Sequence, residues 1–109
     1  MPWLRNAPQP LGKRGEAAAA RFLRRRGYRI VGRNVWLGRN EIDLIARRKD
    51  TVVFVEVRTC AQGAVVRPED SLTRTKRRHI RAAARRYIAT HPEPDTYYRY
   101  DIIAVIQPE

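Results

Sequence analysis

The stretch from Asn40 to Arg58, NEIDLIARRKDTVVFVEVR, constrains the fold more than any other part of the chain. It predicts two strands, Glu41 to Arg47 and Thr51 to Arg58, because each is rich in Ile, Val, Leu or Phe and polar residues lie between them. If Lys49-Asp50 are the two central residues of a tight turn, the hairpin register is fixed. Every residue of one strand then has a defined partner on the other.

This register gives the hairpin one apolar face and one face that ends in two acids. The apolar face pairs aliphatic residues across the strands: Ile42 with Val57, Leu44 with Val55 and Ala46 with Val53. On the other face Ile45 meets Phe54, and Asp43 lies directly opposite Glu56. Directly opposed β-carbons are only about 5 Å apart, and like charges there are destabilising. The two carboxylates therefore need a positive partner, and a divalent cation held by oxygen ligands, Mg²⁺ above all, is the obvious candidate.

Arg58 offers a second explanation for the two acids. It lies two residues beyond Glu56, so the side-chain alternation of a strand puts it on the same face. An ion pair between Arg58 and either acid would need no metal. The register is itself an inference, since a slip of one residue would send Asp43 to the opposite face. The residues alone leave both explanations open.

Length and composition predict one small domain. A chain of 109 residues with 43% hydrophobic residues can bury one modest core. No apolar run approaches the ~20 residues of a membrane span, and the amino end lacks the apolar segment of a secretory signal. The single cysteine, Cys60, excludes an internal disulfide, and His79 and His91 suggest no metal motif. We expect a flexible N-terminal arm (1–11), a single domain (12–109) and a reducing, cytoplasmic setting without a membrane.

Charge is the strongest global feature of the composition. Lys and Arg total 23 against 11 acids, which gives a net charge of +12 and a pI of about 11.2. Such an excess usually marks a polyanionic partner, most often nucleic acid, with an acidic membrane surface or protein as the alternative. The residues predicted to contact phosphates are arginines on two helices: Arg24, Arg25, Arg26, Arg77 and Arg78.

Periodicity predicts the remaining elements. Helices at about 12–26 and 73–89 and strands at 28–36 and 97–106 flank the hairpin. The buried stripes of the helices consist of Ala19, Ala20 and Leu23 in the first, and of Ile80, Ala83, Ala84, Tyr87 and Ile88 in the second. The order α-β-β-β-α-β predicts an α/β (α+β) fold, with a mixed central sheet of about four strands flanked by two main helices.

Two charged residues lie on these apolar stripes. Glu16 precedes Ala19 and Leu23 at helical spacing, so it points towards the core side of a basic helix. An acid favoured by the helix amino terminus is the simpler explanation. Lys76 lies one turn ahead of Ile80 and is placed to reach over the sheet edge. The alternative for Lys76 is a side chain that covers the core boundary while its ammonium stays in water.

Short motifs occur along nearly the whole chain. They are G-K-R-G-E-x-x-A from Gly12, L-x-x-x-G-Y from Leu23, Asn34, E-I-D-L-I-A from Glu41, V-F-V-E-V from Val53, Lys76, and D-I-I-A-V in the last strand. Together they resemble the YraN family. The resemblance implies a restriction-endonuclease-like fold of the kind found in archaeal Holliday-junction resolvases.

The resemblance also implies roles for the residues of the PD-(D/E)XK nuclease pattern. Asp43 would be the first metal-binding carboxylate and Glu56 the second, with the backbone carbonyl of Val57 as a further ligand. Glu16 would match the helical acid of the resolvase-like branch. The implied cofactor is Mg²⁺ or Mn²⁺, and the implied partner is nucleic acid, DNA rather than RNA. Related resolvases act as dimers, so a homodimer is a further expectation.

The chain departs from the family pattern at three positions. Arg58 stands where the family normally has lysine, Cys60 where it usually has arginine, and Asn40 where glycine normally precedes E-I-D. Arginine can bind phosphate bidentately, but it is bulkier than lysine and cannot give up a proton near neutral pH. Lys76 could supply the missing ammonium if it reaches the same pocket.

Three functions therefore compete. The main hypothesis is a Mg²⁺-dependent nuclease-like protein that hydrolyses phosphodiesters, including those of branched DNA, with Arg58 and Lys76 at the phosphate. The second is a catalytically silent basic module that binds DNA or RNA with the same fold. The third is an RNA-binding component of a larger particle, which would be indifferent to the loss of Asp43 and Glu56.

Overall fold

The computed structural model describes residues 11–61 and 74–107. Two helices and four strands follow the predicted order. Their bounds are α1 Leu11–Arg25, β1 Arg29–Leu37, β2 Asn40–Arg48, β3 Thr51–Ala61, α2 Arg74–Thr90 and β4 Tyr97–Gln107. No helix within these ranges is long and apolar enough to cross a membrane.

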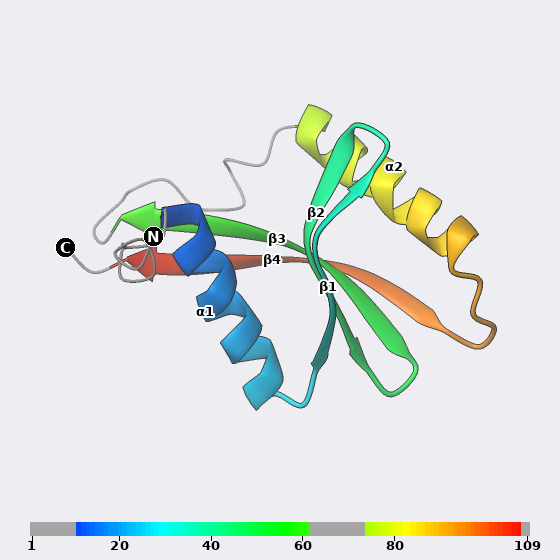
Figure 1. Cartoon of the computed structure of the whole chain (residues 1–109), viewed down its shortest axis with the longest axis horizontal. Helices are drawn as coiled ribbons and strands as arrows, with labels where there is room; N and C mark the ends of the chain where they lie inside the picture. The colour runs from blue at the N-terminus through cyan, green and yellow to red at the C-terminus, as the bar shows by residue number, and fades with distance from the viewer. Residues whose placement is uncertain (1–10, 62–73, 108–109) are drawn as a thin grey trace, which may run out of the picture.

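The four strands form one mixed sheet in the order β1-β2-β3-β4. β1, β2 and β3 are antiparallel neighbours, whereas β4 runs parallel to β3. A parallel pair needs a crossover connection, and α2 lies in that connection. Figure 1 shows α1 and α2 on opposite faces of the twisted sheet. The α+β fold predicted from the sequence is confirmed.

Each helix packs a stripe of small residues on its face of the sheet. On the α1 face, Ala19, Ala20 and Leu23 form a core with strand residues Leu44, Ala46, Val53 and Val55. On the α2 face, Ala83 and Ala84 form a second core with Ile42, Ile45, Val52 and Phe54. The two central strands, buried on both faces, therefore carry most of the core. Both helix stripes predicted from the sequence are confirmed.

The hairpin register is confirmed over the half nearest the turn. The pairs run from Arg48–Thr51 to Leu44–Val55, and Lys49 in the turn has a φ of 55°. The register pairs end at Leu44–Val55, and the prediction that Ile42 faces Val57 is wrong. Ile42 belongs to the α2 core, whereas Val57 packs against the α1 core. The strands part at this point because the Val57 N–H donates to the Asp43 carboxylate rather than to a backbone carbonyl.

Most element boundaries differ from the prediction by one residue, and the end of β3 differs by three. β3 continues through Ala61, so Thr59 and Cys60 are strand residues rather than the start of a loop. The reason is β4, whose parallel ladder pairs with β3 as far as Ala61–Gln107. The rest of the predicted loop lies outside the described residues. So do residues 1–10 of the predicted N-terminal arm, while Leu11 is the first residue of α1.

Candidate functional site

Asp43 lies where β2 leaves β3. Its Oδ2 accepts a hydrogen bond from the Val57 N–H at 2.8 Å. The side chain thus occupies the place that a strand carbonyl would take in a regular ladder. This contact fixes the carboxylate in the gap between the two strands, and it brings Val57 into the site through its N–H. The Val57 carbonyl as a metal ligand stays a prediction.

Three acids converge at this gap from two elements. Glu16 comes from the first half of α1, and Glu41 and Asp43 come from the start of β2. One carboxylate oxygen of each lies within 4.8 Å of the other two. The structure therefore brings Glu16 and Asp43 together, as the sequence predicted, and adds Glu41. Three oxygen donors at this spacing are the ligand type that Mg²⁺ and Mn²⁺ prefer.

Asn34 ties two of the acids together. Its Nδ2 donates to Glu16 Oε1 at 3.1 Å and to Glu41 Oε1 at 2.9 Å. Its Oδ1 accepts from Lys13 Nζ at 2.7 Å, and the same ammonium lies 3.6 Å from Glu16 Oε2. Asn34 has a φ of 47°, a left-handed conformation that asparagine tolerates better than most residues. The backbone of β1 thus aims this amide at the acids.

Glu56 and Lys76 extend the cluster towards α2. Glu56 is buried, with 5% of its surface exposed, and its Oε1 lies 3.4 Å from Lys76 Nζ. Burial of a carboxylate is costly unless it is paired. Lys76, near the start of α2, provides the opposite charge. The predicted reach of Lys76 over the sheet is therefore observed.

Burial and the neighbouring acids change the protonation of Asp43. Its pKa is raised from 3.8 to about 7, chiefly by burial. The Val57 N–H opposes this shift, while the charge of Glu56, a hydrogen bond with Glu56 and the charge of Glu16 add to it. Asp43 and Glu56 are thus neighbours through their side chains, although the direct cross-strand pairing predicted for them is not observed. Near neutral pH, the acids favour a proton or a cation between them.

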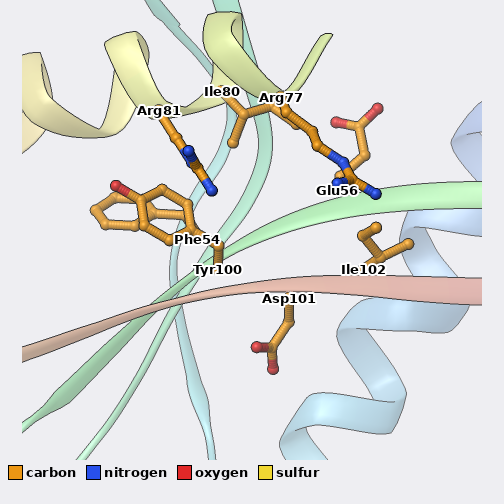
Figure 2. Close-up of a pocket in the computed structure, with 8 residues that line it drawn as sticks. All are labelled: Phe54, Glu56, Arg77, Ile80, Arg81, Tyr100, Asp101 and Ile102. Atoms are coloured by element: carbon orange, nitrogen blue, oxygen red, sulfur yellow. The ribbon is translucent and has the colours of Figure 1, made fainter. Parts of the chain in front are cut away.

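The arginines predicted to contact phosphate lie in different parts of the structure. Arg58 is half-buried on β3, two residues beyond Glu56. Arg77 projects from α2 to a groove that Glu56 also lines (Figure 2). Arg24, Arg25 and Arg26 lie at the opposite end of α1 from Glu16. A ligand centred on the acids therefore meets the first turns of α2 before it meets the end of α1.

Sequence reasoning missed Glu41 as a site residue and gave Asn34 no role. Glu41 could have been found, because it is two residues before Asp43 on the same strand and shares its face. Asn34 was noted only as part of the family motifs. Its role depends on the left-handed backbone of β1, for which the sequence pattern carries no clear signal.

The acids open onto a groove that also carries cations. A cavity of about 260 Å³ is lined by Glu41 and Asp43 together with Trp36, Arg39, Asn40, Lys76, His79 and Ile80. Trp36 is 63% exposed at this groove. A basic wall beside an acidic cluster suits a phosphate group that shares a metal ion with the acids.

Comparison with known proteins places this site in a family. The model of the uncharacterised protein family UPF0102 matches residues 15–105. The chain belongs to the UPF0102 family. The resemblance to the YraN family is thereby confirmed, and the match spans all the acids described above.

Individual UPF0102 proteins are similar over almost the whole chain. The UPF0102 protein CT2262 of Chlorobaculum tepidum is 46% identical over 101 residues, which cover 93% of this chain and 78% of the relative. A UPF0102 protein of Nitratidesulfovibrio vulgaris is 40% identical over 102 residues, 94% of this chain and 76% of the relative. One of Anaeromyxobacter dehalogenans is 41% identical over 97 residues, 89% and 72%. None of these names states an activity.

Proposed function

We propose that this protein is a metal-dependent nuclease acting on phosphodiester bonds, in DNA rather than RNA. One observation carries the proposal: acids from α1 and β2 converge within 4.8 Å of one another in a chain whose net charge is +12. A basic protein that only bound a polyanion would gain nothing from a cluster of acids at its groove. A divalent cation accounts for both the acid cluster and the positive net charge, because it can bind the acids and a phosphate at the same time.

The residues present fit Mg²⁺ or Mn²⁺. Mg²⁺ holds oxygen ligands at about 2.0–2.1 Å, so the outermost acids need only a small inward movement to share one ion. Glu16, Glu41 and Asp43 would hold the ion, with Glu56 as the neighbouring acid. When bound, such an ion lowers the pKa of a coordinated water and neutralises charge on the phosphate.

The remaining residues orient the acids and the substrate. Asn34 orients Glu16 and Glu41 through its two donated hydrogen bonds. Lys76, beside Glu56, supplies a positive charge on the α2 side of the acids. Arg58 adds charge on β3. Arginines on the helices provide backbone contacts that do not depend on sequence.

A binding module without cleavage is the second candidate, favoured by Arg58. Arginine stabilises charge but does not act as a proton donor or acceptor near neutral pH. Lys76 lies 3.4 Å from Glu56, the acid of β3, but it reaches Glu56 from another element, α2. If Arg58→Lys creates metal-dependent cleavage in a protein that binds DNA but does not cut it, the second candidate is correct.

The test is titration calorimetry with Mg²⁺ and Mn²⁺, followed by cleavage assays on branched and single-stranded DNA. Wild type is expected to bind the metal, and Asp43→Asn and Glu41→Gln to lose most of that binding. Asp95→Asn, in the loop between α2 and β4, is the matched control and should bind as wild type does. Absence of binding by wild type at millimolar metal, with and without DNA, would refute the metal site.

A further inference from the structure

A second groove is lined by Glu56 and by none of the three clustered acids. It has a volume of about 210 Å³ and runs between α2 and strands β3 and β4. Figure 2 shows its lining residues, which are Phe54, Glu56, Arg77, Ile80, Arg81, Tyr100, Asp101 and Ile102. An apolar cavity of about 150 Å³ is enough for a benzene ring. The groove therefore has room for one planar aromatic group.

Tyr100 presents an aromatic surface to this groove. It is 45% exposed, and its ring centroid lies 5.8 Å from that of Phe54, with an angle of 36° between the planes. Phe54 is fully buried, so it supports the tyrosine ring from the core. Ile80 and Ile102 close the apolar walls. A flat apolar ligand would find a rigid stacking partner here.

The rim of the groove is basic. Arg77 and Arg81 are one turn apart on α2 and both are exposed; Arg81 extends towards the aromatic rings and Arg77 towards Glu56 (Figure 2). The Asp101 carboxylate points away from the groove and accepts two hydrogen bonds from Arg99, each 2.9 Å long. Glu56, the remaining acid of the groove, lies 3.4 Å from Lys76. The groove thus combines an aromatic platform with cations at its edge.

We propose that this groove binds one unpaired nucleobase of a nucleic-acid strand whose neighbouring phosphate lies at the acid cluster. This inference rests on the proposed function and names its substrate class. Aromatic side chains with nearby cations are the usual platform for single-stranded bases. A paired base is already stacked on both sides and must leave the duplex to enter such a groove. An apolar side chain of a protein partner would not use the two arginines.

The test compares three fluorescent DNA probes by anisotropy at low salt, first without metal and then with Mg²⁺. One is a perfect duplex, the second carries a single unpaired nucleotide, and the third carries an abasic residue at that same position. The last two differ only in the base. Wild type is expected to bind the unpaired nucleotide about 5- to 100-fold more tightly than the abasic probe, the range that stacking of one base provides.

Tyrosine variants test whether the unpaired base stacks on Tyr100. Tyr100→Ala should reduce the ratio between the two probes to about one, and Tyr100→Phe should keep it because the ring remains. Tyr97→Ala removes another exposed tyrosine of β4, outside the groove, and should also keep the ratio. Thermal melting of each variant separates loss of stacking from loss of fold.

Three results would overturn the proposed binding of an unpaired base. A ratio of about one in wild type, with all probes bound, overturns this inference and leaves the proposed function standing. A ratio that survives in Tyr100→Ala also overturns it, because the base then binds elsewhere. Failure of wild type to bind any probe, both without and with Mg²⁺, removes the proposed function as well.

Discussion

Asp43 combines two roles that usually belong to different residues. Its carboxylate accepts the Val57 N–H and so ends the β2–β3 ladder, and it also lies among the other acids of the site, where burial raises its pKa. A folded protein without metal must keep this carboxylate among other acids. Keeping this carboxylate there therefore costs the folded state some stability.

The first residue-scale prediction concerns pH and Asp43. Its pKa is raised from 3.8 to about 7, so between these values the folded state holds a proton that the unfolded state has lost. Stability must then fall as the pH rises from about 4 to about 7, and change no further above that. Asp43→Asn, which cannot titrate, should lack this fall. At full strength the shift corresponds to about 4 kcal/mol, which solvent screening of a half-buried group reduces to about 1–2 kcal/mol.

Urea unfolding in EDTA at pH 5 and pH 8 measures this effect. Asp43→Asn should gain about 1–2 kcal/mol on wild type between the two pH values, while Asp95→Asn should gain nothing. A difference between wild type and Asp43→Asn that does not depend on pH would show that Asp43 keeps an ordinary pKa. Added Mg²⁺ should stabilise wild type and Asp95→Asn but not Asp43→Asn.

At the scale of elements, α1 lies close against β3 at Gly15. A β-carbon at this position would lie 2.2 Å from Thr59 Oγ1, far inside van der Waals contact. Glu16 is the next residue, so the same approach sets the position of this acid over the sheet. Glycine costs a helix about 0.5–1 kcal/mol relative to alanine, and the close contact explains why that cost is accepted here.

Gly15→Ala should destabilise the fold by about 1–3 kcal/mol, as overpacking does, despite its better helix propensity. It should also weaken Mg²⁺ binding, because α1 and Glu16 are pushed away from Asp43. Thr59→Ala leaves the Thr59 β-carbon position 3.5 Å from the new methyl, an ordinary contact. The double variant should therefore recover both stability and metal binding. Losses that simply add in the double variant would contradict this steric account.

The same scale shows what the sequence could and could not predict. The helices, the turn at Lys49 and the paired half of the hairpin depend on local periodicity, and their prediction was correct. The side-chain alternation of β2 breaks after Asp43 because the Asp43 carboxylate replaces a backbone carbonyl as the acceptor for the Val57 N–H. The local sequence carries no signal for this replacement. The extension of β3 through Ala61 depends on β4, which lies far away in sequence.

The site was predicted in part for the same reason. Periodicity puts Glu16 and Lys76 on the apolar stripes of their helices, and it puts Asp43 on one face of its strand. The structure brings these three residues to one region. Predicting Glu41 as a site residue needed only the side-chain alternation of β2 to be followed two residues back from Asp43. Predicting the role of Asn34 needed the three-dimensional path of β1, because its amide donates to Glu16 on α1 and to Glu41 on β2.

At the scale of the whole molecule, the excess of positive charge is distributed over both helices, which lie on opposite faces of the sheet (Figure 1). The acids lie near the start of α1 and the start of α2. Along α1, Arg25 is nine residues from Glu16, roughly 13 Å at the rise of a helix. Net charge alone attracts nucleic acid to every basic surface, whereas a substrate at the acids must contact the start of α2.

Two double variants with the same net charge distinguish these cases. Arg24→Ala/Arg25→Ala and Arg77→Ala/Arg78→Ala each lower the net charge from +12 to +10. The α2 pair should weaken DNA binding and reduce the slope of log K against log salt by about two, because each phosphate contact contributes about 0.9 to that slope. The α1 pair should change the slope by less than about one. The measurement is fluorescence anisotropy with one duplex over a range of salt concentrations. Equal losses in both variants would show that charge acts through its total alone, and a loss confined to the α1 pair would put the DNA on the face away from α2.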